Sequence, residues 1–195
     1  MLFPNFVNVV EVNDRYVYPI FKNGSTTMLK SDNARVLTPT EIRDLELIDV
    51  YIREPYERFL SGILTYCKEY DIDPAQAAKI INRVHFLDNH FCPQLFWVLN
   101  LKRFTNADIR INNLDNLPTN KKLQNKQTGY DQLNKLFLDN IDLKFHLELD
   151  YVLYENHMDQ IVSVDGILET LKSNYADLYN QTFGYTKTIM ADIGI

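Results

Sequence analysis

The chain has 195 residues, a formal net charge of −6, and a composition of 46% hydrophobic and 24% charged residues. This composition is typical of an ordinary globular protein, and the length predicts one domain over residues 1–195 with a sizeable core. The negative charge excludes an overall basic surface for nucleic acid, so an anionic ligand needs a local group of cations. The candidates for such a group are Lys22, Lys30, Arg53 and Arg58.

Residues 1–12 are apolar but interrupted by polar residues, and they lack the basic start of a signal peptide. No apolar run approaches the length of a membrane span, so we expect a cytoplasmic protein without a membrane partner. Cys67 and Cys92 have no metal or redox spacing and are expected to be reduced thiols. The spacing of His85, His90 and Cys92 matches no common zinc framework, so we expect no metal site.

Residues 16–21 are aromatic and β-branched, which predicts a short buried strand, and residues 3–12 predict an edge strand. A turn with a glycine follows, and hydroxyl residues then open a helix over about residues 25–31. The free N–H groups of a helix start, its dipole and a lysine ammonium together make an anion site. The residues assigned to this site are Lys22, Asn23, Gly24, Ser25, Thr26 and Thr27. For the loop alone, an ordinary turn capped by Ser25 or Thr26 is an equal alternative.

A second apolar strand, residues 47–52, leads to Arg53, and a proline two positions later is well placed as the first residue of a helix. Apolar residues then recur at the 3–4 spacing of one buried helix face. Ser61 lies eight residues after Arg53, in the pattern R-x-P-x-x-R-x-x-S. We expect Glu57 and Arg58 on the solvated face of this helix.

A lysine loop followed by R-x-P-x-x-R-x-x-S resembles the two nucleotide-binding elements of the sulfotransferases, especially the carbohydrate sulfotransferase branch. The stretches DNHFCPQ and LDYVLYENH fit the same branch, so the resemblance covers about residues 16–157. It implies that the Lys22 loop binds the 5′-phosphosulfate of PAPS (3′-phosphoadenosine 5′-phosphosulfate), and that Arg53 and Ser61 bind its 3′-phosphate. The animal carbohydrate sulfotransferases are membrane-anchored in the Golgi, so a soluble bacterial or viral relative fits this chain better.

Sulfuryl transfer needs charge on the leaving phosphate to be offset, a role for Lys22 and the loop amides, and a general base for the acceptor hydroxyl. His90 in DNHFCPQ is the first candidate for the base, with Asp88 to orient it. A histidine that only holds a turn together is an equal alternative. Glu41 is the second candidate because it lies between the two motifs, although a surface helix often starts with such a glutamate.

The rest of the chain predicts further helices, one strand and a polar loop. Helices are predicted from Asp73 to about His85, over residues 130–141, through residues 147–154 and over residues 161–179, with a strand over residues 107–111 and a solvated loop over residues 112–128. Strand–loop–helix–strand–helix order predicts an α/β fold, a parallel sheet with helices on both faces and ligands at the carboxyl ends of its strands. The resemblance implies the same three-layer P-loop-like architecture.

The leading hypothesis is a PAPS-dependent sulfotransferase that acts on a hydroxyl of a carbohydrate or small metabolite and releases PAP (3′-phosphoadenosine 5′-phosphate). A non-catalytic nucleotide-binding module of the same fold is the alternative, since no histidine lies between the two motifs. A P-loop-type kinase is a third possibility. The missing G-x-x-x-x-G-K-[ST] pattern counts against it, as does the lack of a clear Walker B aspartate on the second strand.

Overall fold

The structure is a computed structural model that describes residues 8–77, 89–117, 144–177 and 180. Its strands are β1 Val10–Val12, β2 Arg15–Tyr18, β3 Arg35–Val36, β4 Leu47–Ile52, β5 Asp108–Asn113 and β6 Ile161–Val162. Its helices are α1 Ser25–Leu29, α2 Pro39–Arg43, α3 Pro55–Tyr70, α5 Gln94–Leu101, α7 Lys144–Asn156 and α8 Val164–Asn174, with a 3₁₀ turn, η1, over Leu114–Asn116. None of these helices is both long and apolar enough to cross a bilayer.

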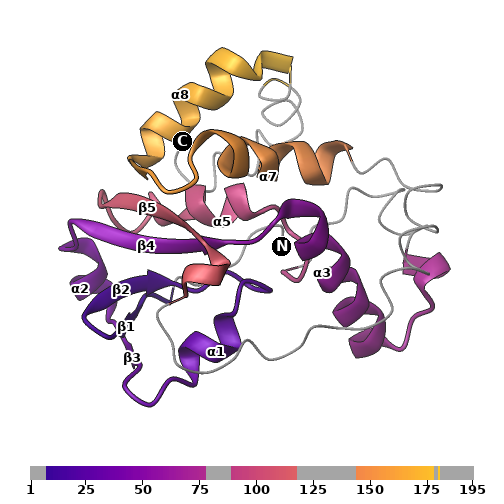
Figure 1. The fold of residues 1–195 in the computed structure, drawn as a ribbon, viewed down its shortest axis with the longest axis horizontal. Coiled ribbons are helices and arrows are strands. Elements are labelled where there is room, and N and C mark those ends of the chain that lie inside the picture. The colour runs from indigo at the N-terminus through magenta and orange to yellow at the C-terminus, as the bar shows by residue number, and fades with distance from the viewer. Residues whose placement is uncertain (1–7, 78–88, 118–143, 178–179, 181–195) are drawn as a thin grey trace.

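The strands form one sheet in the order β3-β1-β2-β4-β5-β6, and the fold is α/β (Figure 1). The three inner strands β2, β4 and β5 run parallel, whereas β1, β3 and β6 join antiparallel. The prediction of a parallel sheet is therefore wrong for the outer strands. Asn13 and Asp14 explain one departure, because both have positive φ (50° and 59°) and form the tight turn that folds β1 back on β2. The predicted edge strand is also not at the edge, since β3 lies outside β1.

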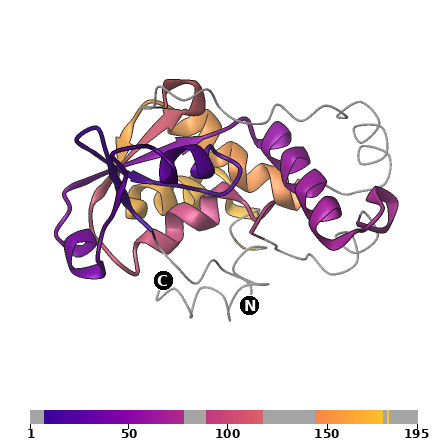
Figure 2. The same ribbon diagram turned by 90° about the horizontal axis from the view of Figure 1, so that it is seen from below.

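Two hydrophobic cores lie on opposite faces of the sheet. The larger core packs Ile48, Val50 and Ile52 of β4 against α5, α7 and α8. The smaller core packs the alternate residue Tyr51, together with Val17 of β2, against Met28 of α1. Figure 1 shows α1 below the central strands and α7 and α8 above them, and in Figure 2, seen from below, α1 lies in front of α7 and α8. The two faces of β4 are thus both covered, because side chains alternate along a strand.

Most of the predicted local elements that fall on described residues are confirmed. The strands over residues 47–52 and 107–111 are β4 and β5, and a helix begins at Pro55. The last predicted helix begins later than expected, because Ile161 and Val162 pair with β5 and the Ser163 side chain caps α8. The predicted helix over residues 130–141 lies outside the described residues, as does the predicted loop from residue 118 onward. The described start of that loop is the end of β5 and η1.

Candidate anion-binding site

The two sequence motifs follow neighbouring strands of the sheet, at the end where the parallel strands finish. β2 and β4 are parallel neighbours in which Val17 faces Asp49 and Tyr18 faces Val50. The loop with Lys22 follows β2, and Arg53 follows β4 and leads into α3 (Figure 1). In sheets of this kind ligands bind beyond the carboxyl ends of the parallel strands, where such loops meet.

Lys22 is held in an uncommon backbone conformation with its side chain against α3. Its φ is 69°, in the left-handed region that few residues other than glycine adopt, and its ammonium contacts the hydroxyl of Thr65. Burial lowers the pKa of Lys22, and the positive charges of Arg58 and Arg53 lower it further. Glu69 acts in the opposite direction. Lys22 is therefore a half-buried cation with the positive charges of Arg58 and Arg53 close by.

Arg53 lies two residues before α3, and Ser61 lies in the first half of that helix. The Arg53 guanidinium donates hydrogen bonds to Glu57, at 3.1 Å from Nη2 and 3.2 Å from Nε, and its side chain is 19% exposed. Ser61 is buried, and its carbonyl accepts a bond of 3.0 Å from Thr65, the residue that Lys22 contacts. Lys22 and Ser61 therefore both contact Thr65 of α3, and the charge of Arg53 is close enough to Lys22 to lower its pKa.

The other loop residues differ in their surroundings. Asn23 is fully buried, and its Nδ2 donates to the Tyr51 carbonyl (2.9 Å) and to Gln94 Oε1 (2.6 Å), so this side chain holds the loop together. Gly24, with a φ of 73°, occupies the cap position of α1 in place of the expected Ser25 or Thr26. Of the residues that follow Gly24, Ser25 is half-buried, Thr26 is exposed and Thr27 is buried.

His90 lies 6.0 Å, between ring centroids, from Phe21, the residue before Lys22, and faces a carboxylate that the sequence did not predict. His90 Nε2 is 3.3 Å from Glu69 Oε2, and Glu69 is also close enough to Lys22 to influence its pKa. Asp88, the expected orienting residue, lies outside the described residues. Thr65 and Glu69 follow Ser61 at intervals of four residues, so the helical periodicity that continues beyond the motif is the signal that could have identified them.

Glu41 lies at the opposite end of β4. It belongs to α2, which precedes β4, whereas α3 follows it, and a six-residue strand is about 20 Å long. Its carboxylate closes a capping box with Thr38 and pairs with Arg35 at 2.6 Å. Hydrogen bonds from the Thr38 backbone and Arg35 lower the pKa of Glu41 to about 2. This placement counts against Glu41 as the base.

Arg58 corrects one expectation about α3. The predicted solvated face holds for Glu57, which is 61% exposed, but Arg58 is only 1% exposed. Arg58 Nε donates to the Phe21 carbonyl (3.2 Å), and Nη1 lies 3.9 Å from Asp150 Oδ2. A buried guanidinium requires such partners, and the carboxylate comes from α7, far along the chain.

Asp150 and Gln94 complete this buried group. Asp150 Oδ1 accepts from the Leu95 amide (3.1 Å), and Oδ2 accepts from Gln94 Nε2 (3.3 Å). Burial raises the pKa of Asp150 to about 6, although the Arg58 charge and these hydrogen bonds lower it. Both residues lie in the stretches DNHFCPQ and LDYVLYENH, yet neither was predicted as a site residue. A polar residue inside an apolar helix pattern was the available signal for Asp150.

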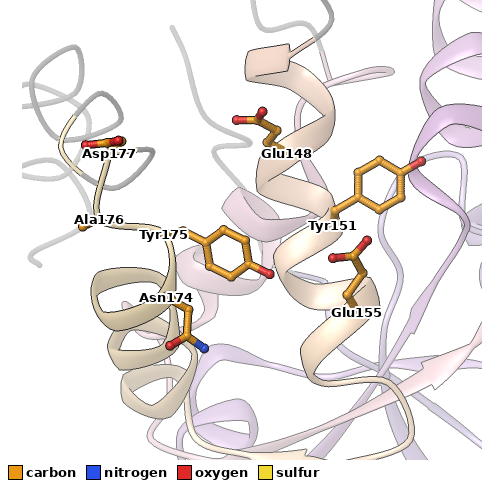
Figure 3. Close-up of a pocket in the computed structure, with 7 residues that line it drawn as sticks. All are labelled: Glu148, Tyr151, Glu155, Asn174, Tyr175, Ala176 and Asp177. Carbon is orange, nitrogen blue, oxygen red and sulfur yellow. The ribbon is translucent and has the colours of Figure 1, made fainter.

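A separate cavity of about 460 Å³ lies between α7 and the end of α8. It is lined by Glu148, Tyr151, Glu155, Asn174, Tyr175, Ala176 and Asp177 (Figure 3). None of these is a predicted site residue. Figure 3 shows Tyr175 pointing from the end of α8 toward α7, which carries two of the carboxylates. Its three acidic side chains make this cavity unsuitable for a phosphosulfate group.

Comparison with known proteins returned no match: no family model matches the chain, and neither does any curated protein or solved structure. Within the described part of the chain, no three His, Cys, Asp or Glu side chains are grouped so that they could hold a metal ion.

Proposed function

We propose that this chain is a PAPS-dependent sulfotransferase that transfers a sulfuryl group to a hydroxyl of a carbohydrate or small metabolite. The proposal includes a three-layer P-loop-like fold around the parallel strands β2, β4 and β5. The observation that supports it is that the Lys22 loop and Arg53 follow the neighbouring parallel strands β2 and β4, and that the Lys22 ammonium contacts Thr65, one turn after Ser61 on α3.

The electrostatics of the site favour an anion. Burial lowers the pKa of Lys22 most, and repulsion from Arg58 and Arg53 lowers it further. A bound dianion beside Lys22 and Arg53 relieves this repulsion. In the proposed reaction Lys22 offsets charge on the leaving phosphate, and Arg53 and Ser61 hold the 3′-phosphate. His90 accepts the proton of the acceptor hydroxyl, with Glu69 holding its imidazole in place.

Calorimetric titration with PAP, AMP and ATP tests this proposal. We expect the wild type to bind PAP more tightly than AMP or ATP, and Lys22→Ala and Arg53→Ala each to weaken PAP binding by about tenfold to a hundredfold. Neither change removes a buried apolar group, so the thermal midpoint should be nearly unchanged. Lys172→Ala on α8 removes an exposed lysine and should leave PAP binding unaltered.

Transfer of the sulfuryl group is measured in the same preparations with PAPS and a panel of sugars. No binding of PAP, or a clear preference for ATP, would contradict the sulfotransferase proposal. Tight PAP binding without transfer to any hydroxyl, and without loss of sulfate from PAPS, would favour the non-catalytic module. His90→Ala should abolish transfer while PAP binding persists.

A further inference from the structure

The side chain of Gln94 joins the two loops of the candidate site. Its Oε1 accepts from Asn23 Nδ2 (2.6 Å) and from the Arg53 amide (3.0 Å), and its Nε2 donates to the Arg53 carbonyl (3.0 Å). The amide group of Gln94 therefore pairs with both backbone groups of Arg53, as a neighbouring strand does. Gln94 and Asn23 are both fully buried, so these bonds do not compete with water.

Gln94 is itself held in place by α7. Asp150 accepts from Gln94 Nε2 and also from the Leu95 amide, so it supplies a cap for α5 that Pro93 cannot provide. Arg58, opposite Asp150, donates to the carbonyl of Phe21, the residue before Lys22. The loop of Lys22 and the backbone of Arg53 are thus tied to a single buried framework.

We propose that Gln94, supported by Asp150, is a specificity-determining positioning residue that sets the spacing between the Lys22 loop and Arg53. This inference rests on the proposed function. A nucleotide with phosphates at both the 3′ and 5′ positions contacts both loops only when the loops are correctly spaced. If the loops must first become ordered, the entropy cost of ordering them weakens binding. A nucleotide with a 5′-phosphate alone needs only the Lys22 loop. This loop is also held by the bond from Asn23 to the Tyr51 carbonyl and by the bond from Arg58 to the Phe21 carbonyl.

Gln94→Ala tests the inference through the ratio of the PAP and AMP dissociation constants. We expect PAP binding to weaken by about tenfold and AMP binding by less than about threefold, so that the preference for PAP shrinks. The matched control is Asn100→Ala, which removes an equally buried side-chain amide from the same helix. Both variants should lower the thermal midpoint, but Asn100→Ala should keep the wild-type ratio.

Two further measurements keep the inference open to refutation. If Gln94→Ala does not fold, Gln94→Met keeps about the size of the side chain and removes its hydrogen bonds without adding a charge beside Asp150, so a fall in the ratio like that of Gln94→Ala is expected. Hydrogen exchange needs no nucleotide: the amides of Asn23 and Arg53 should exchange faster in either Gln94 variant and not in Asn100→Ala.

The outcomes separate the two proposals. A folded Gln94 variant that keeps the wild-type ratio and the wild-type exchange rates overturns the positioning role and leaves the sulfotransferase proposal intact. An equal fall in the preference for PAP in Asn100→Ala also overturns the positioning role, because the fall in Gln94→Ala would then reflect lost stability alone. If the wild type does not bind PAP, the specificity role falls with the proposed function, and only the exchange rates would show that Gln94 holds the loops.

Discussion

Two layers of polar side chains lie at the carboxyl ends of β2 and β4, and they differ in burial. The inner layer consists of Asn23, Arg58, Gln94 and Asp150, all at most 2% exposed. The outer layer consists of Lys22, Arg53, Glu69 and His90, whose side chains reach solvent to different degrees. In the inner layer protein groups satisfy one another, whereas the outer layer presents cations and a histidine to the outside.

The difference separates residues that hold the site from residues that face a ligand. Replacing an inner residue leaves a buried donor, acceptor or charge without its partner, and the cost appears as lost stability. The inner layer is already imperfect, because Asn23 Oδ1 and Arg58 Nη2 are buried without a hydrogen-bond partner. Replacing an outer residue leaves groups that water can solvate, so we expect the cost to appear in binding.

The largest expected effect is that of Arg58→Met. It leaves the buried Asp150 carboxylate without its cation, and we expect a loss of about 3–5 kcal/mol in the free energy of unfolding. Lys22→Ala in the outer layer should cost less than about 1 kcal/mol. Urea denaturation measures both. The double change Arg58→Met with Asp150→Asn removes both charges, keeps an acceptor for the Leu95 amide, and should recover part of the loss. A single-variant loss as small as that of Lys22→Ala would contradict the distinction between the layers.

Gly62→Ala is expected to have the next largest effect, because α3 packs directly on the backbone of the outer-layer residue His90. A Cβ at Gly62 would lie 2.2 Å from the His90 carbonyl oxygen, so backbone must move. Alanine favours a helix by about 1 kcal/mol, but we expect overpacking to dominate with a net loss of about 1–3 kcal/mol.

Gly166→Ala is the matched control in α8. Its Cβ would meet only side-chain atoms, Val162 Cγ2 at 3.0 Å and Ser163 Oγ at 3.3 Å, which can shift. Thermal denaturation should therefore show a much smaller change for Gly166→Ala. Equal losses at the two glycines would mean that the contact of α3 with His90 does not constrain the outer layer.

The most gradual effect, on the order of 1 kcal/mol for each pH unit, is a pH dependence that comes from Asp150. Because burial raises its pKa to about 6 in the folded protein, the folded state binds a proton more readily than the unfolded state between about pH 4 and 6. The stability of the wild type relative to Asp150→Asn should thus fall as the pH rises through this window, by at most roughly 1 kcal/mol per pH unit. Urea denaturation at pH 4.5, 5.5 and 7 measures this. A relative stability that rises with pH would mean that Arg58 outweighs burial.

The sequence alone located the short-range features of this protein. Apolar and β-branched runs predicted β4 and β5, and the proline after Arg53 marked the start of α3. The two motifs also led to Lys22 and Ser61, which both contact Thr65 of α3 in the structure. These features were predictable because strand periodicity, proline geometry and helix spacing depend on neighbouring residues.

Tertiary structure decided which polar residues are buried and which strands run antiparallel. Arg58 has the sequence context of a surface residue, and its burial follows from Asp150, which a distant helix carries. Gln94 meets Asn23 and Asp150 across separations of 71 and 56 residues, so no local pattern reveals the contacts. A buried charge is tolerated only beside its partner, and the partner is known only after the chain has folded.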